Sequence, residues 1–459
     1  MHFQTIADLS DAIRRKSISP VEVTQHMLRR IETTHAAYGA YVTVTAERAL
    51  EQAAAAEAAI MRGGWRGPLH GVPFALKDII YTDFAPTTGG TLINADFRAE
   101  FNATVVERLE AQGAVTLGKV KTTEQAFAIH HPSVQPPRNP WNPEYFSGVS
   151  SSGSGVAAAA GLAYGTLGSD TGGSIRFPSA ANGVTGLKPT WGRVSRYGVF
   201  PLAWSLDHIG PIARSAVDAA IILQAIAGWD PRDPTALHAP VPDYLGGCSG
   251  SISGLRIGLP MEYATSGVAA EVVEALQGAV AALQLQGAVI KEIEFPPYQE
   301  ALAAWGPLCS VETAMAHEAT YPSRAKDYGP VLAGFIEAGR QTSARDLAAA
   351  YLSKFDFSNR LAGVFKEVDL LIIPTLTTCV PTAQAWEEAV VAGALADAIR
   401  FTGPFDVSGS PTLTLCNGFD AKGLPLSFQL AGPHLSEGLL FKAGAAYQRV
   451  TDWHLRHPG

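Results

Sequence analysis

The sequence predicts an α/β protein whose central β-sheet is covered on both faces by helices. Short apolar segments typical of buried strands alternate along the chain with longer segments of helical periodicity. The strand segments are apolar throughout rather than at every second position, which is typical of a sheet covered on both faces. With 459 residues and 47% hydrophobic content, the chain is long enough to bury a large core.

The first sixty residues are expected to be helical. The segment SPVE at 19–22 has a capping serine, a proline suited to the first helical position and the glutamate of a capping box. Apolar residues then recur at four-residue spacing from Val23. Residues 46–62 are rich in strong helix formers and end at a Gly-Gly pair.

Beyond residue 69, strands and helices are expected to alternate. The predicted strands lie at 72–78, 114–119, 163–169, 255–260, 288–295, 369–375, 412–419 and 424–432. The predicted helices lie at 104–112, 152–160, 215–227 and 268–286, in several pieces between 298 and 367, and at 436–448. We expect one domain over 1–459 with an N-terminal helical segment at about 1–65, and we interpret the Pro- and Asp-rich stretch 228–254 as a surface excursion rather than a domain boundary.

Composition and charge narrow the function classes. The formal net charge is −8 with no basic stripe, which argues against nucleic acid as a partner. The N-terminus has no apolar stretch of signal-peptide type, and no apolar run is long enough to span a bilayer, so no membrane partner is expected. The four cysteines lie far apart without a C-x-x-C pair, which predicts reduced thiols, no zinc site and a cytoplasmic location.

Common catalytic motifs are incomplete in this chain. It contains no P-loop, and HEATY at 317–321 lacks the second histidine of a zinc motif. GGSIR at 172–176 differs from the G-x-S-x-G elbow at its last residue. SRAK at 323–326 matches S-x-x-K only as a four-letter coincidence in a long chain.

Three other segments carry candidate chemistry. Lys77 ends the apolar strand at 72–78, and burial there would lower the pKa of its amine, by about 3 units or roughly 4 kcal/mol to reach neutrality at pH 7. A neutral lysine can act as a base. The Ser- and Gly-rich segment 147–161 leads into an Ala-rich helix, although composition alone favours a flexible loop there.

The third segment is GSDTGGSIRFP at 168–178. Its glycines allow the N–H groups of Thr171, Gly172, Gly173 and Ser174 to converge on one point, where they could stabilise an oxyanion. The alternative is an ordinary glycine turn between a strand and a helix. No histidine lies within thirty residues of Ser174, so a nucleophilic serine here would need another base.

Together these segments resemble the amidase signature family. The resemblance rests on HGVPFALKD (70–78), SSSGSGVAAAAG (150–161), GSDTGGSIRFPSAANGVTGLKPTWGRVSRYG (168–198) and SLDHIGPIARS (205–215), and extends to LPLSFQLAG (424–432). It implies the amidase signature fold, with a mixed central sheet covered on both faces by helices. It also implies a hydrolase of amide C–N bonds that needs no cofactor and no metal.

The resemblance further implies a Ser–cis-Ser–Lys triad. Ser174 corresponds to the nucleophile, Ser150 to the bridging serine after a cis peptide bond, and Lys77 to the base, with the N–H groups of 171–174 as the oxyanion hole. Groups around this site are implied to be Ser151, Ser169, Asp170 and Arg176.

Three stretches depart from the family pattern and leave the substrate open. GVSSSGS (148–154) has Val149 and Ser152 where the family has glycines, and FDVSGSPTL (405–413) and the loop at 121–143 also differ. His130 and His131 lie in that loop, where simple exposure is the more common role, and Trp141 and Trp204 are candidates either for an acyl pocket or for core packing.

The expected function is cleavage of a small amide, anilide or carbamate, or an aryl ester, through an acyl-enzyme, by an enzyme that acts alone or as a homodimer. The alternatives are a glutaminase-type subunit of a tRNA-dependent amidotransferase and a non-catalytic binding protein on the same fold.

Overall fold

The computed structural model describes all residues, 1–459, and its strands form one mixed sheet. The sheet has the strand order β1-β3-β2-β4-β6-β5-β10-β11-β9-β7-β8. The strands are β1 (Tyr41–Val44), β2 (Pro73–Lys77), β3 (Val115–Val120), β4 (Gly165–Asp170), β5 (Thr185–Lys188), β6 (His208–Ala213), β7 (Arg256–Leu259), β8 (Val289–Glu292), β9 (Leu370–Pro374), β10 (Thr412–Phe419) and β11 (Pro425–Ala431). Strands β2, β3 and β4 are mutually parallel, as are β7, β8 and β9, whereas the strands between these groups pair antiparallel.

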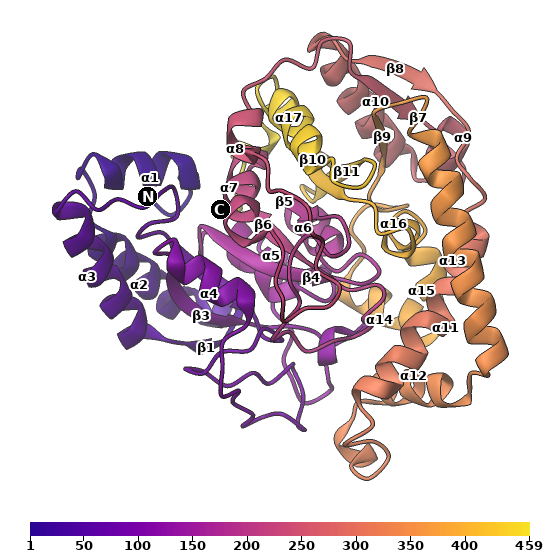
Figure 1. Ribbon diagram of the computed structural model, residues 1–459, viewed down its shortest axis with the longest axis horizontal. Coiled ribbons are helices and arrows are strands. Elements are labelled where there is room, and N and C mark those ends of the chain that lie inside the picture. Colours follow the sequence, from indigo (N-terminus) through magenta and orange to yellow (C-terminus); the bar gives the residue numbers. More distant parts are fainter.

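Helices surround this sheet. They are α1 (Ile6–Arg14), α2 (Pro20–Tyr38), α3 (Ala46–Met61), α4 (Thr104–Ala111), α5 (Ser152–Ala159), α6 (Arg176–Asn182), α7 (Ala216–Ile226), α8 (Tyr244–Gly247), α9 (Met261–Thr265), α10 (Ala270–Leu285), α11 (Gln299–Ala316), α12 (Pro330–Gln341), α13 (Ala344–Val364), α14 (Ala383–Val391), α15 (Leu395–Ala398), α16 (Gly403–Val407) and α17 (Glu437–Gln448), with 3₁₀ turns η1 (Glu124–Ala126), η2 (Ala325–Asp327) and η3 (Trp453–Leu455). Helices α1–α3 lie at one end of the molecule and α11–α13 at the other (Figure 1). The α/β class with helices around a mixed sheet is as predicted. No helix combines the length and apolar character needed to cross a membrane.

Both ends of helix α2 follow from its local sequence. Ser19 caps α2 through the N–H groups of Val21 and Glu22, and the reciprocal bond from Glu22 completes the capping box that the sequence predicts. Helix α2 ends at Gly39, which has a left-handed conformation with φ 57°.

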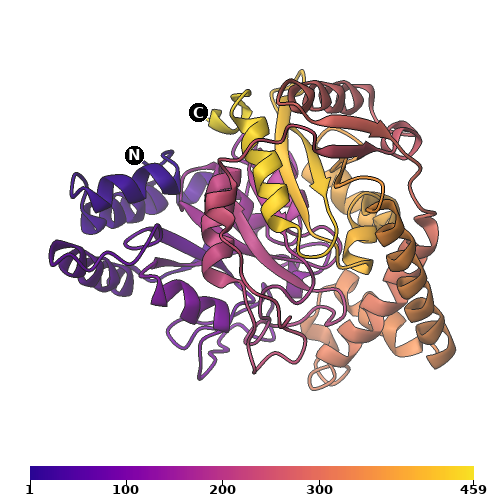
Figure 2. The ribbon, with the colours of Figure 1, turned by 45° about the horizontal axis from the view of Figure 1, so that its top comes forward.

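Three strands were not predicted from the sequence. β1 is short, and β5 and β6 contain glycine, proline and polar residues in place of an apolar run. β5 and β6 nevertheless occupy the middle of the sheet, since they join the parallel β2–β4 group to β10 (Figure 2). Conversely, the strand predicted at 288–295 is longer than the strand observed there. Only β8 forms, at the edge of the sheet, and its residues are largely exposed.

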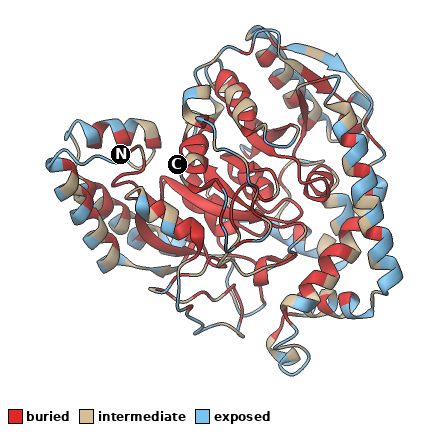
Figure 3. Ribbon diagram, viewed as in Figure 1, coloured by how far each residue is buried: buried red, intermediate tan, exposed pale blue.

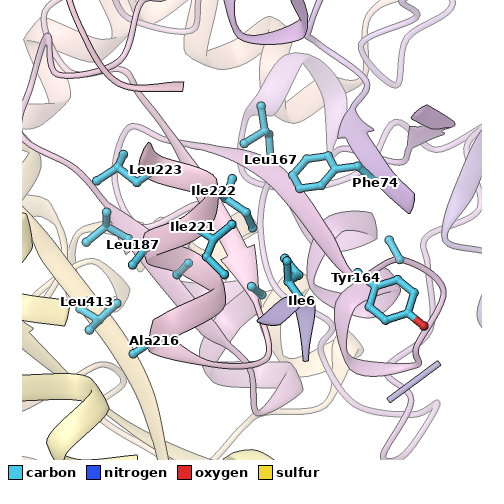
Figure 4. Packing of buried hydrophobic residues seen from close by; sticks show 14 of the residues in the cluster. Ile6, Phe74, Tyr164, Leu167, Leu187, Ala216, Ile221, Ile222, Leu223 and Leu413 are labelled. Atoms are coloured by element: carbon cyan, nitrogen blue, oxygen red, sulfur yellow. The ribbon is translucent and has the colours of Figure 1, made fainter. Parts of the chain in front are cut away.

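The core lies between the sheet and its covering helices. Helix α7 packs on the strands: Ile222 lies on the side of Phe74 of β2 and Leu167 of β4, and Leu223 lies beside Leu187 of β5 (Figure 4). Each of these side chains is at most 3% exposed, and full burial of such a side chain contributes about 1.5–3 kcal/mol. The buried residues concentrate on the central strands, and the outer sides of α3 and α13 face solvent (Figure 3).

This architecture brings three chain segments to one edge of the sheet. β2 and β4 are neighbours and parallel, so their carboxyl ends, at Lys77 and Asp170, lie at the same edge. The serine-rich segment that leads into α5 packs against both strands at this edge. The predicted candidate residues therefore meet at the carboxyl ends of β2 and β4 and in the loops that follow these strands.

Candidate active site

Lys77 is completely buried and donates to two serine hydroxyls. Its Nζ lies 2.5 Å from Ser150 Oγ and 2.7 Å from Ser169 Oγ. Ser150 comes from the serine-rich segment and Ser169 from β4, so the amine joins two elements that are separate in the sequence. The sequence analysis placed Lys77 and Ser150 in one site, and the structure brings them into direct contact.

The backbone holds Ser150 from both sides. The Val149–Ser150 peptide bond is cis. The carbonyl of Ser150 accepts from the N–H of Thr123 at 3.2 Å, and the next N–H, of Ser151, donates to the carbonyl of Ser174 at 3.3 Å. The second of these bonds ties the serine-rich segment to the turn that carries Ser174.

Ser174 is the most accessible of the three predicted triad residues. It is 8% exposed, whereas Lys77 and Ser150 are 0% exposed. Its side chain lines a cavity, and its hydroxyl makes no hydrogen bond within the protein, including none to Ser150. Hydrogen bonds between the catalytic groups of enzymes are often long before substrate binds, so the absence of a Ser174–Ser150 bond leaves Ser174 a candidate nucleophile.

Burial changes the protonation of Lys77. Removal of the ammonium from water lowers the pKa of Lys77 to about 7, and the more distant carboxylates of Asp170 and Asp207 oppose the shift only in part. A substantial fraction of the amine is therefore neutral near pH 7, and a neutral amine can accept a proton.

The turn that carries Ser174 is anchored by one buried carboxylate. Asp170 accepts from the N–H groups of Gly173 at 2.7 Å and Ile175 at 2.9 Å. Arg176 donates to the same carboxylate through Nη2 at 2.7 Å and Nε at 3.0 Å, and both side chains are fully buried. The Arg176 guanidinium holds the pKa of Asp170 well below its usual range, so the pair is ionised.

Three N–H groups of this turn remain available to a ligand. The N–H groups of Thr171, Gly172 and Ser174 donate no hydrogen bond within the protein, whereas that of Gly173 is occupied by Asp170. The carbonyls are held from behind, since Thr171 accepts from Trp305 Nε1 at 2.8 Å and Gly172 accepts from Thr402 Oγ1 at 2.5 Å. Of the four predicted oxyanion donors, Gly173 thus already has a partner and the other three are free.

Ser151, at the start of α5, and Ser169, on β4, support the site from behind Lys77. Ser151 Oγ donates to the carbonyl of Ser169 and accepts from its N–H, both at 3.2 Å. Ser169 Oγ is the second acceptor of the Lys77 amine. Both serines therefore fix where the amine lies relative to the serine-rich segment.

The cavity at Ser174 is small and mostly apolar. Its volume is about 30 Å³, and its walls include Phe127, Phe177, Trp305, Leu395 and Ile399. None of these five was singled out as a pocket residue by the sequence, because the side chains that cover Ser174 are set by tertiary packing rather than by a local motif. The two tryptophans that were singled out lie elsewhere: Trp141 donates to the carbonyl of Asn182 and Trp204 is 43% exposed, so neither lines this cavity.

A larger cavity of about 230 Å³ adjoins the first and shares Ala128 with it. His130 lines it, and its Nε2 lies 3.2 Å from Ser152 Oγ. Burial lowers the pKa of His130 to about 3, which keeps the ring neutral. His130 is half-buried by solvent exposure, whereas His131 is buried and lines neither cavity. The only group of residues spaced to bind a metal, Glu271, Cys379 and Asp420, is outside both cavities.

Comparison with known proteins relates the whole chain to amide-cleaving enzymes. The Amidase family profile matches residues 22–441. The chain is 44% identical over 455 residues to the amidase-family protein AmiD of Mycobacterium tuberculosis, covering 99% of this chain and 95% of that protein. It is 39% identical over 489 residues to one subunit of the glutamyl-tRNA(Gln) amidotransferase of Chloroflexus aggregans, covering 100% and 98% of the two chains. The solved structure of a bacterial aryl acylamidase of the amidase signature family matches with a TM-score of 0.89 at 26% identity, covering 99% of this chain and 97% of that one.

Proposed function

The chain belongs to the amidase signature family and is an amide-hydrolysing enzyme, and we propose that it cleaves small amides through an acyl-enzyme formed on Ser174. The observation that carries the proposal is the buried amine of Lys77, with a pKa of about 7, in contact with Ser150 Oγ. It supplies a base beside the serine-rich segment, where no histidine is hydrogen-bonded to Ser174.

In the first step Ser174 Oγ attacks the substrate carbonyl carbon. The Ser174 proton passes to Ser150 Oγ while the Ser150 proton passes to the Lys77 amine, which becomes an ammonium. The carbonyl oxygen takes the negative charge and is stabilised by the free N–H groups of Thr171, Gly172 and Ser174.

Collapse of this intermediate breaks the C–N bond. The Lys77 ammonium returns its proton through Ser150 to the departing nitrogen, so the amine leaves neutral and the acyl group stays on Ser174. Water then attacks the acyl-enzyme with the same relay as base, which releases the acid and restores the serine. Asp170 and Arg176 keep the turn in place through both steps.

The apolar wall of the small cavity supports a small alkyl group beside the carbonyl, and the adjoining cavity of about 230 Å³ has room for an aryl group. Phe127, Phe177 and Trp305 provide flat apolar surface beside Ser174. Anilides fit this description, as do aryl esters and aryl carbamates, since all form a tetrahedral intermediate at the same carbonyl position. The likeness to an aryl acylamidase supports the anilide class.

A substrate panel tests the proposal. We expect p-nitroanilides, simple amides, aryl esters or aryl carbamates to be hydrolysed by the wild-type enzyme, and Ser174→Ala to remove the activity. A fluorophosphonate should modify Ser174 in the wild type, as read by peptide mass spectrometry. Hydrolysis that persists in Ser174→Ala would assign the nucleophile to another residue.

The similarity to part of a glutamyl-tRNA(Gln) amidotransferase supports a second candidate, a glutaminase that delivers ammonia within a complex. That function predicts release of ammonia from glutamine and co-elution with the other proteins of the complex in gel filtration. Elution as a lone chain or a homodimer, together with turnover of the amide panel and none of glutamine, would favour the stand-alone amidase. A non-catalytic binding role has no support among the relatives.

A further inference from the structure

A second carboxylate, Asp406 of α16, lies behind the turn that carries Ser174. Its Oδ2 accepts from Arg176 Nη2 at 2.6 Å, and the same nitrogen donates to Asp170 at 2.7 Å. All three side chains are 0% exposed. One guanidinium therefore bridges two buried carboxyl groups, those of Asp170 and Asp406, which are 236 residues apart in the sequence.

Helix α16 is joined to the turn at two further points. Arg176 Nη1 donates to the carbonyl of Thr402 at 2.8 Å, and Thr402 Oγ1 donates to the carbonyl of Gly172 at 2.5 Å. The residue after Asp406 is also held, because its carbonyl accepts from Lys354 Nζ at 2.5 Å. These hydrogen bonds fix the position of Asp406 relative to the turn, so its carboxyl group can orient Arg176.

The charged groups around Asp406 do not favour its ionisation while Asp170 is also ionised. The titratable groups that face it are Arg176 from α6, Asp170 from β4, Lys188 from β5, His208 from β6, Cys309 from α11 and Lys354 from α13. Burial lowers the pKa of Lys188 to about 7 and that of His208 well below its usual value, so neither is a full positive charge at neutral pH. Arg176 already neutralises Asp170.

The geometry agrees with a protonated Asp406. Burial raises the pKa of Asp406 well above its usual range. Its Oδ1 receives no hydrogen bond and lies 3.6 Å from His208 Nδ1. A buried carboxylate oxygen without any donor is costly, whereas a protonated Asp406 carries no negative charge and can donate its proton to the adjacent Asp170 carboxylate. His208 Nε2 lies 3.1 Å from Lys188 Nζ, so both imidazole nitrogens face polar neighbours.

We propose that Asp406 is a positioning residue for hydrolysis, which holds the Ser174 turn through Arg176 and Asp170 and releases it when it ionises. The proposal rests on the role of Ser174 proposed above. An ionised Asp406 competes with Asp170 for the Arg176 guanidinium and repels the Asp170 carboxylate at close range. Asp170 then holds the N–H groups of Gly173 and Ile175 less firmly, and activity falls on the alkaline side.

Two measurements on four proteins test the proposal: wild type, Asp406→Asn, Asp406→Ala and the control Asp397→Ala. Asp397 lies on α15, is exposed and has no side-chain partner. The first measurement is the rate of fluorophosphonate modification of Ser174 from pH 6 to 10. The second is hydrogen exchange of a peptide covering 168–177, which reports on the turn whether or not Ser174 is the nucleophile.

We expect Asp406→Ala to label at least tenfold more slowly than wild type at pH 7 and to exchange faster in the 168–177 peptide. Asp406→Asn, which keeps a neutral group of the same shape, should restore labelling to within about threefold of wild type and lack the alkaline decline that wild type shows. Asp397→Ala should follow wild type at every pH.

The outcomes separate the two proposals. Absence of labelling at Ser174 in folded wild type would contradict the proposed nucleophile, and the exchange data would still decide the role of Asp406. Unchanged exchange in Asp406→Ala, or an alkaline decline in Asp406→Asn equal to that of wild type, would overturn the positioning role. If Asp406→Ala does not fold, the alkaline labelling profile of Asp406→Asn alone decides whether Asp406 has the positioning role.

Discussion

Lys77 Nζ lies 2.5 Å from Ser150 Oγ, and neither side chain has any contact with solvent. A lysine is rarely buried without a carboxylate partner, and here its direct partners are two neutral hydroxyls. Burial without a carboxylate in contact therefore favours the neutral amine over the ammonium, and this preference governs both the expected chemistry and the pH dependence of stability.

The rate of hydrolysis should depend on the ionisation of Lys77. With its pKa lowered to about 7, we expect kcat/KM to rise roughly tenfold per pH unit below pH 7 and to level off between pH 7 and pH 8. Steady-state kinetics from pH 5 to 8 on one amide substrate check this. A profile that stays flat over that range, with the chemical step rate-limiting, would exclude a lysine base.

Replacement of Lys77 by methionine should change how stability depends on pH. The folded state binds the Lys77 proton less tightly than the unfolded state, since its pKa is about 7 against 10.5. The lysine therefore costs stability at low pH, and wild type becomes more stable as pH rises from 7 to 10.5. Between pH 7 and 9.5 the free energy of unfolding of wild type should gain about 3 kcal/mol relative to Lys77→Met.

Urea denaturation of both proteins at pH 7 and pH 9.5 measures this difference. Lys77→Met should also lose amidase activity by several orders of magnitude while its circular dichroism spectrum keeps the wild-type form. Equal pH dependence in the two proteins would mean that the amine is charged in the folded state.

Gly173 should not tolerate a side chain. It has φ 136°, and an added Cβ would approach Phe177 to 2.5 Å and Thr402 Oγ1 to 2.9 Å. Gly173→Ala is expected to reduce kcat/KM at least a hundredfold, because the turn that carries Ser174 must move.

Gly278, inside α10, is the matched control, since a Cβ there has nothing within 4 Å. Gly278→Ala should keep activity and stabilise the protein by about 0.5–1 kcal/mol in thermal denaturation. Full activity of Gly173→Ala would contradict a fixed turn.

Glu124 should make stability fall as pH rises. It is 2% exposed, its carboxylate accepts from the N–H of Gly329 at the start of α12, and burial raises its pKa to about 7. The folded state thus binds this proton more tightly than the unfolded state, in which the pKa is near 4.5. The stabilising contribution is complete below pH 4.5 and is lost as pH rises through 7.

Glu124→Gln removes that loss. Relative to wild type, its free energy of unfolding should increase by about 2–3 kcal/mol between pH 4.5 and pH 8. Glu387→Gln on α14, an exposed glutamate without an ion-pair partner, serves as the control and should parallel wild type. Parallel curves for Glu124→Gln and wild type would show that the carboxyl titrates normally.

The sequence was sufficient for features that depend on local pattern. The capping box at Ser19, the apolar strand ending in Lys77 and the alternation of strands and helices follow from residue spacing, and the structure contains them. Lys77 and Ser150 were placed in one site by resemblance to a family, and the contact between them depends on the parallel pairing of β2 and β4, which no local pattern encodes.

The features that the sequence did not predict depend on tertiary context. β5 and β6 have little strand propensity and form because neighbouring strands pair with them on both sides. Trp305, Leu395 and Ile399 line the cavity because α11 and the α15 region pack over the Ser174 turn. Asp406 lies in the stretch 405–413 that departs from the family pattern, but no local pattern indicated its contact with Arg176, a residue 230 positions earlier.

The sheet order also determines when a newly made chain can become active. Lys77, Ser150 and Ser174 are all synthesised in the first 174 residues, yet Arg176 awaits Asp406, and β5 awaits β10 as its neighbour. A chain still attached to the ribosome at residue 400 therefore has its proposed nucleophile but neither the support behind that turn nor the strand that closes the sheet. With the proposed mechanism, we expect hydrolysis to begin only after the residues of α16 and β10 have been synthesised and have folded onto the rest of the chain.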